Sequence, residues 1–384
     1  MAAKGTSAEV IGVRIAAQRR SVGMKQAQLA GRVGVHRNTI SKWEKGETEP
    51  TGSEIFRVGE ALGCGFLEIL SPSARLIAPQ FAFRAHKMLR KDVDLVVKGR
   101  KCVQAYREIE EILETPLGGV LRRYPFDPNE TPAGNWIEMA AEELRESSGL
   151  GGRGPENLPL ILESLGVRCL FFETPVKGID ALSTIYDGMD FVLLKRPERG
   201  IERTLFSAAH ELGHLVLHPN LFATEDESEA QDNGRDYEGE ANLFAGCFLV
   251  PRDDLIRVWK EERLSRLPIL HAVLFLKRIF SVSFHCLFYR LRELGLSSVP
   301  HRTVIHALKQ HLGIKGPARM EELEPEPLPP SILLRSTRFE RLVQSAFLQE
   351  EIGVSKVAEL FQITVDRAMK ETNQWWLPQS ALVE

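Results

Sequence analysis

Two histidines and a glutamate form a short motif in the middle of the chain. Residues 210–214 have the sequence His-Glu-Leu-Gly-His, within a segment (about 203–217) whose apolar spacing predicts a helix. His210 and His214 are one helical turn apart, so both imidazoles can point from one face at the same zinc ion. Glu211 flanks that position and has the chemistry of a general base.

A second predicted helix, at residues 236–248, offers the rest of a metal site. Glu238 can complete a set of two histidines and one carboxylate, and Asn242, one turn further on the same face, can hold a ligand in place. Three protein ligands leave a fourth position for water. Zinc lowers the pKa of such a water to about 7, and Glu211 can take its proton and pass it to a leaving amine. The expected activity is that of a zinc peptidase.

His218 continues the same histidine spacing but is not expected to be a ligand. Eight residues of helix place it about 12 Å along the axis from His210, too far to share that metal. Capping or packing beside the metal ligands is the expected role.

Residues 25–44 have the pattern of two helices joined by a tight turn. Gly34 separates the helices and can adopt the positive φ that the turn requires. The apolar residues expected to pack the two helices together are Leu29, Ala30, Val33, Ile40 and Trp43. This is helix-turn-helix geometry.

The second of these helices carries side chains that can contact DNA. A helix-turn-helix unit places the N-terminal side chains of its second helix at base edges in the major groove. Arg37, Asn38, Thr39 and Lys42 are therefore the predicted contacts there, because Arg and Lys donate to guanine and Asn bonds adenine bidentately. Gln26, at the start of the first helix, is expected near a phosphate.

The charge of the chain is unevenly distributed. Residues 1–100 hold 17 Lys and Arg against 9 Asp and Glu, although the whole chain has a net charge of −3. An excess of basic residues in the N-terminal part of the chain agrees with a polyanionic binding partner. The five cysteines are far apart, which excludes a disulfide framework and indicates a reducing cytoplasm, and no apolar run is long enough to span a membrane.

The length predicts two or three domains, of an α+β, predominantly helical fold class. Short strands are expected at 167–172 and 191–194. The expected divisions are a helix-turn-helix domain at 1–72, a helical connector and linker at 73–135, a peptidase domain with a helical extension at 136–315, an extended, solvated linker at 316–331 and a small helical segment at 332–384. Within the last segment, residues 353–370 are expected to form a packing or dimerising bundle rather than a second DNA-binding unit.

Two family resemblances support these interpretations. The N-terminal segment resembles the Cro/repressor-like, or XRE, helix-turn-helix family, through Gln26, Leu29, Ala30, Gly34, Val35, Ile40, Ser41, Trp43, Glu44, Gly46 and Pro50. The central segment resembles the ImmA/IrrE-type metallopeptidases, which look like minimal relatives of thermolysin, through residues 144–145, 149–151, 162–167, 206–218 and 238–251. This second resemblance implies that Glu238 is the metal ligand and that Glu240 is a solvated helix residue.

Together these features predict a cytoplasmic transcriptional regulator that carries its own zinc endopeptidase. Such a protein would bind a double-stranded DNA operator, as a homodimer where the operator has two-fold symmetry. In the resembled peptidase family, separate enzymes act on repressors of this helix-turn-helix type, so the expected substrate is a partner repressor or the chain itself. The alternatives are a DNA-binding sensor, whose peptidase-like domain binds ligand or metal without proteolysis, and an antitoxin.

Overall fold

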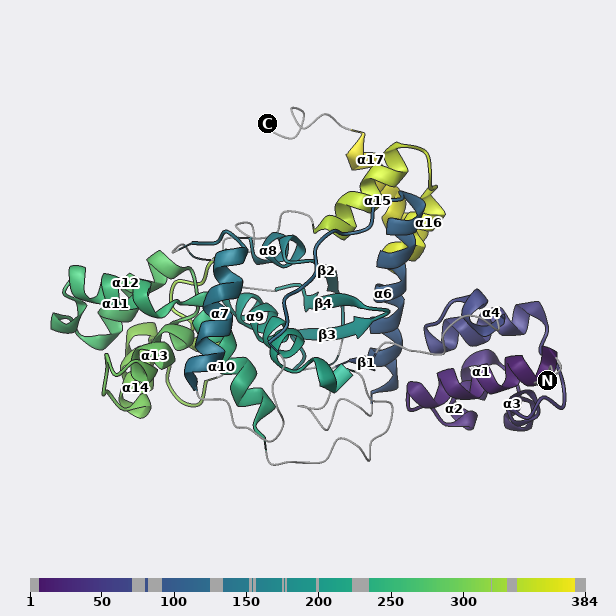
Figure 1. The fold of residues 1–384 in the computed structure, drawn as a ribbon, viewed down its shortest axis with the longest axis horizontal. Helices are drawn as coiled ribbons and strands as arrows, with labels where there is room; N and C mark the ends of the chain where they lie inside the picture. The colour runs from purple at the N-terminus through teal and green to yellow at the C-terminus, as the bar shows by residue number, and fades with distance from the viewer. Residues whose placement is uncertain are drawn as a thin grey trace.

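Over the residues that the structure describes, the protein is mostly helical and contains one small sheet (Figure 1). The computed structural model describes residues 7–70, 80–81, 92–124, 134–151, 154, 157–174, 176, 178–197, 200–222, 235–318, 320–329 and 337–376. Much of the predicted connector at 73–135 lies outside these residues. The predicted α+β, predominantly helical fold class is confirmed.

The N-terminal unit consists of five short helices around one core. They are α1 (Ser7–Ser21), α2 (Gln26–Val33), α3 (Arg37–Glu44), α4 (Gly52–Leu62) and α5 (Phe66–Leu70). Gly34 ends α2 with a φ of 76°, and its N–H donates to the carbonyl of Ala30, as a left-handed helix cap requires. Ile40 and Trp43 of α3 are buried, so the predicted turn and the predicted inward face are both present.

The sheet contains four strands. They are β1 (Gln80–Phe81), β2 (Val167–Phe172), β3 (Ala181–Tyr186) and β4 (Met189–Lys195), in the order β1-β3-β4-β2. β2 runs parallel to β4, whereas β3 runs antiparallel to both β4 and β1. Strands β2 and β4 were predicted and β3 was not. The sequence feature that could have indicated β3 is the Asp187–Gly188 pair, which forms a two-residue hairpin turn with φ values of 51° and 74°.

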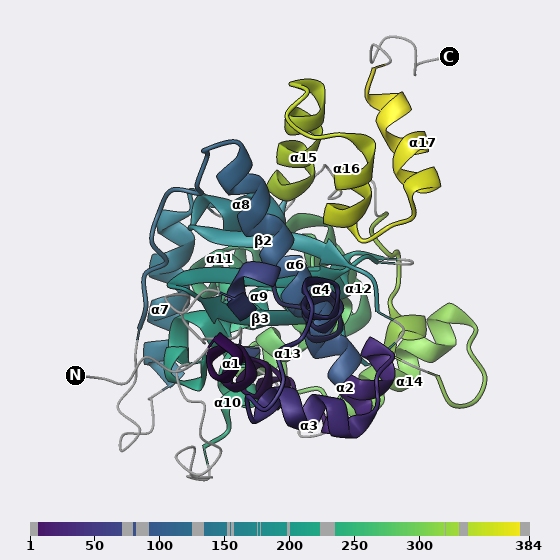
Figure 2. The same cartoon turned by 90° about the vertical axis from the view of Figure 1, so that its right-hand side faces the viewer.

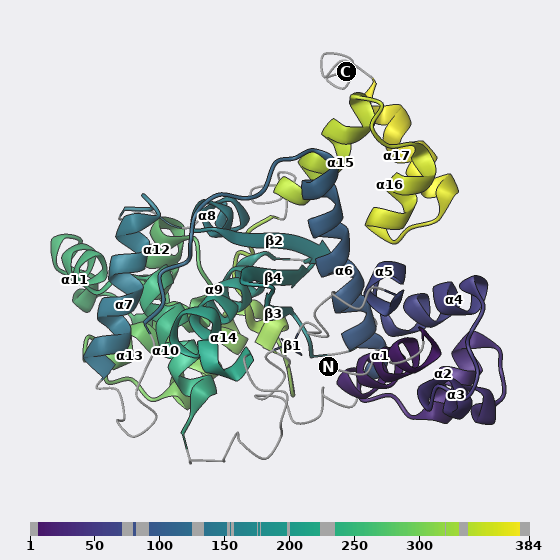
Figure 3. The ribbon, with the colours of Figure 1, turned by 45° about the vertical axis from the view of Figure 1, so that its right-hand side comes forward.

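The two faces of the sheet are covered by different helices (Figures 1 and 3). Val192 and Leu194 of β4 belong to the core formed with α7 (Gly134–Ser147), α8 (Leu158–Ser164), α9 (Glu202–Leu217) and α10 (Tyr237–Leu249). Phe191 and Leu193, which point to the opposite face, pack with the long helix α6 (Val93–Ile112) and with the C-terminal helices. Because α6 also packs against the N-terminal unit, the domain boundaries given above stay predictions.

Four further helices extend the first core. They are α11 (Arg252–Glu261), α12 (Ile269–Phe280), α13 (Phe284–Glu293) and α14 (His301–Leu312). Among the described residues, no single helix is long and apolar enough to cross a membrane, although α12 and α13, bent by 109° at their junction, pass that test as a pair.

The segment predicted to be an extended, solvated linker at 316–331 packs against the body over its described part. Leu323 is buried, and Glu324 accepts a hydrogen bond of 2.7 Å from the buried Lys277. The N–H of Leu328 donates to Glu202 at 2.7 Å. The prediction of a solvated segment was wrong, because partners far away in the sequence satisfy its carboxylates.

The C-terminal segment forms a three-helix group, α15 (Arg338–Leu348), α16 (Val354–Phe361) and α17 (Val365–Trp375). Figure 2 shows these helices gathered apart from the N-terminal unit. Phe339 of α15 stacks on Tyr106 of α6, with ring centroids 5.4 Å apart. The apolar faces of this segment are thus used for packing on the body, which agrees with the predicted packing bundle.

Candidate functional site

The histidine motif lies in the middle of α9, where this helix makes its closest approach to α10. Gly213 allows that approach: a Cβ at this position would lie 3.0 Å from the ring of Phe244 and 3.3 Å from the backbone of Ala241. A larger residue would push the helices apart. The glycine at the second variable position of the motif therefore brings the side chains of α10 within reach of those of α9.

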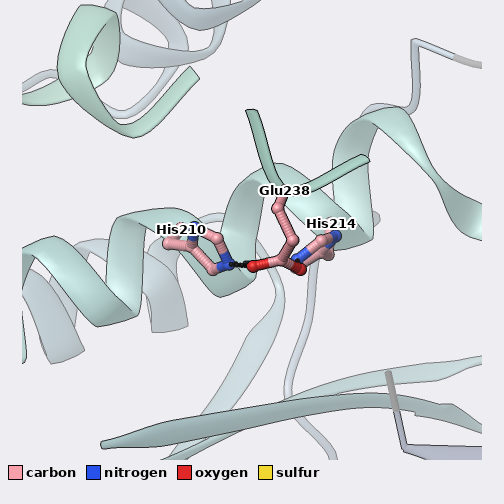
Figure 4. Close-up of side chains that lie close together, drawn as sticks. All are labelled: His210, His214 and Glu238. Atoms are coloured by element: carbon pink, nitrogen blue, oxygen red, sulfur yellow. Dashed lines mark hydrogen bonds and ion pairs between the residues drawn. The ribbon is translucent and has the colours of Figure 1, made fainter. Parts of the chain in front are cut away.

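His210, His214 and Glu238 converge on one point (Figure 4). The Nε2 atoms of the two histidines are 3.0 Å apart. The Glu238 carboxylate places one oxygen 3.4 Å from His210 Nε2 and the other 3.2 Å from His214 Nε2. One potential ligand atom from each residue lies within 4.8 Å of the others, so this group could hold a metal ion.

Hydrogen bonds from outside this group determine which nitrogen of His210 carries its proton. Asn242 Oδ1 lies 3.0 Å from His210 Nδ1. An amide oxygen only accepts, so Nδ1 of His210 donates and Nε2 presents a lone pair to the group. Asn242 therefore lies where it orients His210, the position the sequence suggested for it.

A longer chain of contacts has the same effect on His214. His218 Nε2 lies 2.8 Å from a carboxylate oxygen of Glu240, and its Nδ1 lies 3.1 Å from Nδ1 of His214. Burial lowers the pKa of His218 to about 4, so it is neutral near pH 7. Its Nε2–H donates to Glu240, its Nδ1 accepts from His214, and His214 Nε2 is left with a lone pair.

Glu240 differs from the expectation of a solvated residue. Its side chain is only 13% exposed, and Arg235 donates to both of its oxygens, at 2.7 and 2.6 Å. Burial alone would raise the pKa of Glu240, but the hydrogen bonds from His218 and Arg235 lower it to about 2. The expectation was wrong because it took no account of His218, whose place at the end of α9 brings it to Glu240. The regular four-residue spacing of three histidines was the available signal.

The donor set fits a divalent cation. Two imidazole lone pairs and a carboxylate face one another, and Glu238 Oε1 is buried without a hydrogen bond. Burial alone would raise the pKa of Glu238, yet the facing imidazoles hold it well below its usual range. Burial likewise opposes a charge on His210, whereas Glu238 and Glu211 raise its pKa. The surroundings favour positive charge at this point, and two nitrogens with one carboxylate are typical zinc ligands.

Glu211 is held by a strand residue that the sequence did not suggest. Ser183, fully buried on β3, donates its hydroxyl hydrogen to Oε2 of Glu211. The contact joins α9 to the sheet and restricts the rotamers of the carboxylate. Because β3 itself was not predicted, no signal in the sequence pointed to Ser183.

We expect His218→Ala to weaken zinc binding by about 10 to 100-fold, the usual effect of removing the partner of a metal-ligating histidine. Without His218, Nδ1 of His214 loses its acceptor and either tautomer becomes accessible. Competition with a chromophoric chelator measures the affinity. His271→Ala, which alters an exposed residue of α12, serves as the control. A change of less than about twofold in His218→Ala would show that the chain of contacts does not orient His214.

The predicted DNA-contacting residues lie on the outer side of α3. Arg37, Asn38 and Lys42 are exposed and Thr39 is half-buried. The imidazole of His36 caps the helix, accepting the N–H of Asn38 at 3.2 Å. The N-terminal turn of α3 is therefore ordered and presents its polar side chains to solvent.

Gln26 makes an intramolecular contact instead of standing free at the start of α2. Its amide donates to Glu44 at 2.8 Å, and the same carboxylate accepts from Arg19 at 2.6 Å. The contact ties the first helix of the motif to the end of the second. A phosphate contact by Gln26 stays a prediction.

The sequence matches two known families. Residues 15–69 match the helix-turn-helix family, and residues 162–292 match the IrrE N-terminal-like domain. The chain is 41% identical over 56 residues to Repressor protein C2 of Salmonella phage P22, and 35% identical over 54 residues to the HTH-type transcriptional regulator DicA of Escherichia coli (strain K12). These matches span 15% and 14% of the chain, and 26% and 40% of the lengths of the two relatives. The chain thus carries an XRE-type helix-turn-helix domain and an IrrE/ImmA-like peptidase domain, the two families that its sequence resembles.

Proposed function

We propose that the protein is a DNA-binding transcriptional regulator whose second domain is a zinc-dependent endopeptidase acting in the cytoplasm. The observation that carries the proposal is the convergence of His210, His214 and Glu238 with Glu211 beside them, in a chain that also has a helix-turn-helix domain. The proposed partner of α3 is a double-stranded DNA operator. An operator with two-fold sequence symmetry would be bound by a homodimer.

In this proposal each site residue has a distinct task. His210, His214 and Glu238 would hold the zinc ion, which when bound would supply a water of lowered pKa and polarise the peptide carbonyl. Glu211 accepts the proton on a carboxylate oxygen and delivers it to the leaving amine. Ser183 keeps that carboxylate in one orientation, and Asn242 and His218 keep the two imidazoles in the tautomers that expose Nε2.

The substrate that we propose first is the chain itself, and strand β1 is the reason. Gln80 and Phe81 belong to the connector that follows the N-terminal unit, and they pair antiparallel with Ile185 and Thr184 of β3. Thr184 directly follows Ser183, the residue that holds Glu211. An extended peptide can bind by adding a strand to a sheet edge. Gln80 and Phe81 of the connector therefore lie in extended conformation next to the strand that helps to form the site.

The test is to incubate the zinc-loaded full-length protein, alone and with purified repressors encoded nearby, and to measure intact masses. Self-cleavage within about residues 73–134 would separate the DNA-binding unit from the peptidase domain and give two fragments. Fragments of an added repressor would identify the partner as the substrate. If every chain stays intact in all of these incubations, the peptidase proposal fails. The second domain would then be a receptor for a metal or ligand, without turnover.

For DNA binding, we expect Arg37→Ala to cost about 1–3 kcal/mol at the base pair that Arg37 contacts, because a bidentate base contact carries specificity. Binding of the full-length chain should also weaken steeply with salt, since phosphate contacts release counterions. Fluorescence anisotropy with operator and random duplexes measures both effects.

The matched comparison for Arg37→Ala is Gln26→Ala, which should weaken binding evenly across sequences. An equal loss of affinity for operator and random DNA in Arg37→Ala would refute the placement of this side chain at a base edge.

A further inference from the structure

A cavity of about 260 Å³ lies between the C-terminal helices, α6 and strand β2. Leu170 and Phe172 line it, and they belong to the face of the sheet opposite the core that contains α9. The cavity is thus separate from the metal group. Its volume is close to the lower end of the roughly 300–1,000 Å³ that is common for small-molecule sites.

Aromatic side chains from several elements form the walls of this cavity. Phe339, Phe361 and Trp375 come from α15, α16 and α17, with ring centroids 5.8 Å apart for the first pair and 6.3 Å apart for the second. Phe172 of β2 lines the cavity as well, from the face of the sheet that packs with α6. Walls of this kind favour a flat, apolar ligand body, which can pack edge-to-face or stacked.

Within the described part of the chain, one charged side chain of the lining has no carboxylate partner. Lys98 of α6 is half-buried and makes no hydrogen bond or ion pair with any residue in the described part of the chain. The other charged lining residues pair with one another, Arg196 with Glu340, and Arg367 with Glu173 and Glu371. The charged residues of the lining are three cations and three carboxylates, and among these cations Lys98 is the one whose ammonium group stays available to a carboxylate of a ligand.

We propose that this cavity binds a small aromatic carboxylate, with the carboxylate on the ammonium group of Lys98 and the ring between the aromatic walls. A carboxylate bonded to a half-buried ammonium makes a charge-assisted hydrogen bond, which is stronger than a neutral one. The aromatic ring of the ligand packs against Phe339 and Phe361, where it is removed from water. A neutral amide of the same shape fills the same space but lacks the charge, so it binds more weakly.

The position of Lys98 connects this cavity to the helix-turn-helix domain. On the same helix, the carbonyl of Val97 lies where a Cβ on Gly63 would be only 2.6 Å away, and Lys101 forms a 2.8 Å ion pair with Glu60 of α4. An occupant that binds Lys98 therefore acts on the helix that supports the DNA-binding unit.

Isothermal titration of the zinc-loaded full-length protein tests the proposal, with benzoate and indole-3-acetate as probes and benzamide and indole-3-acetamide as neutral counterparts. We expect saturable binding of the acids with one site per chain, at least about tenfold tighter than binding of the amides. Lys98→Met should weaken binding of the acids at least about tenfold and leave the amides unchanged. The control, Lys260→Met, removes an exposed lysine of α11 and should leave every affinity unchanged.

A second variant keeps the test decisive if Lys98→Met disturbs the fold, which circular dichroism would reveal. Gln344→Trp fills the cavity from α15 while leaving Lys98 intact, and it should abolish binding of acids and amides alike. The proposal is overturned if no acid binds saturably, if acids and amides bind equally, or if a folded Lys98→Met or Gln344→Trp variant binds the acids as tightly as the natural chain.

Discussion

Glu211→Gln should lower peptide cleavage by about 10²–10⁴-fold while zinc, fold and DNA binding are retained. The substitution keeps the size of the side chain and its contact with Ser183, but an amide cannot take a proton from water near pH 7. Glu211 does not belong to the group that could hold the metal, so its charge is not needed to complete the ligand set. Intact-mass analysis of the fragments over time gives the rate, and metal analysis of the same samples gives the zinc content.

The control for this variant is Glu262→Gln, which removes one exposed carboxylate from the end of α11. It should cleave at the natural rate. Equal rates for the natural chain and Glu211→Gln would exclude Glu211 as the general base. Loss of zinc in Glu211→Gln would instead indicate that this residue contributes to metal binding.

Replacing a metal ligand should have the second large effect. In His210→Ala and in Glu238→Ala we expect the zinc affinity to fall by at least about 10²-fold, because two protein ligands remain where three converge. Cleavage should be lost with the metal. The helices should persist, because the buried apolar core around α9 and α10, and not the metal, provides most of the stability.

Metal analysis after desalting, together with circular dichroism, measures both parts of this prediction. His271→Ala, the exposed histidine variant, should retain about one zinc per chain. Full zinc occupancy in the double variant of His210 and Glu238 would mean that the ion binds elsewhere. Unfolding of the single variants would assign a structural role to the metal.

The local elements of both domains were predictable from the sequence. Spacing of four residues places His210 and His214 on one face of a helix regardless of what surrounds it. A glycine between two apolar helical segments predicts the turn at Gly34 for an equally local reason, its tolerance of positive φ. Strands β2 and β4 were predictable from the short apolar runs at 169–172 and 191–194 within them.

Most of the misses depend on residues that are distant in the sequence. Strand β3 combines apolar residues with small polar ones and is buried because β1 and β4 pair with it on either side; its local signal was the Asp187–Gly188 turn to β4. The segment 316–331 was predicted to be solvated, yet its Glu324 accepts a hydrogen bond from the buried amine of Lys277.

Residue type and short-range spacing were enough to indicate which residues could act as metal ligands, general base and DNA contacts. The orientation of these side chains depends on the packing of distant segments. Ser183 reaches Glu211 from a strand, and Glu240 orients His214 through His218. Each of these contacts joins side chains that come together only when a sheet and its covering helices pack. Their geometry is therefore a property of the packed core and not of any local segment.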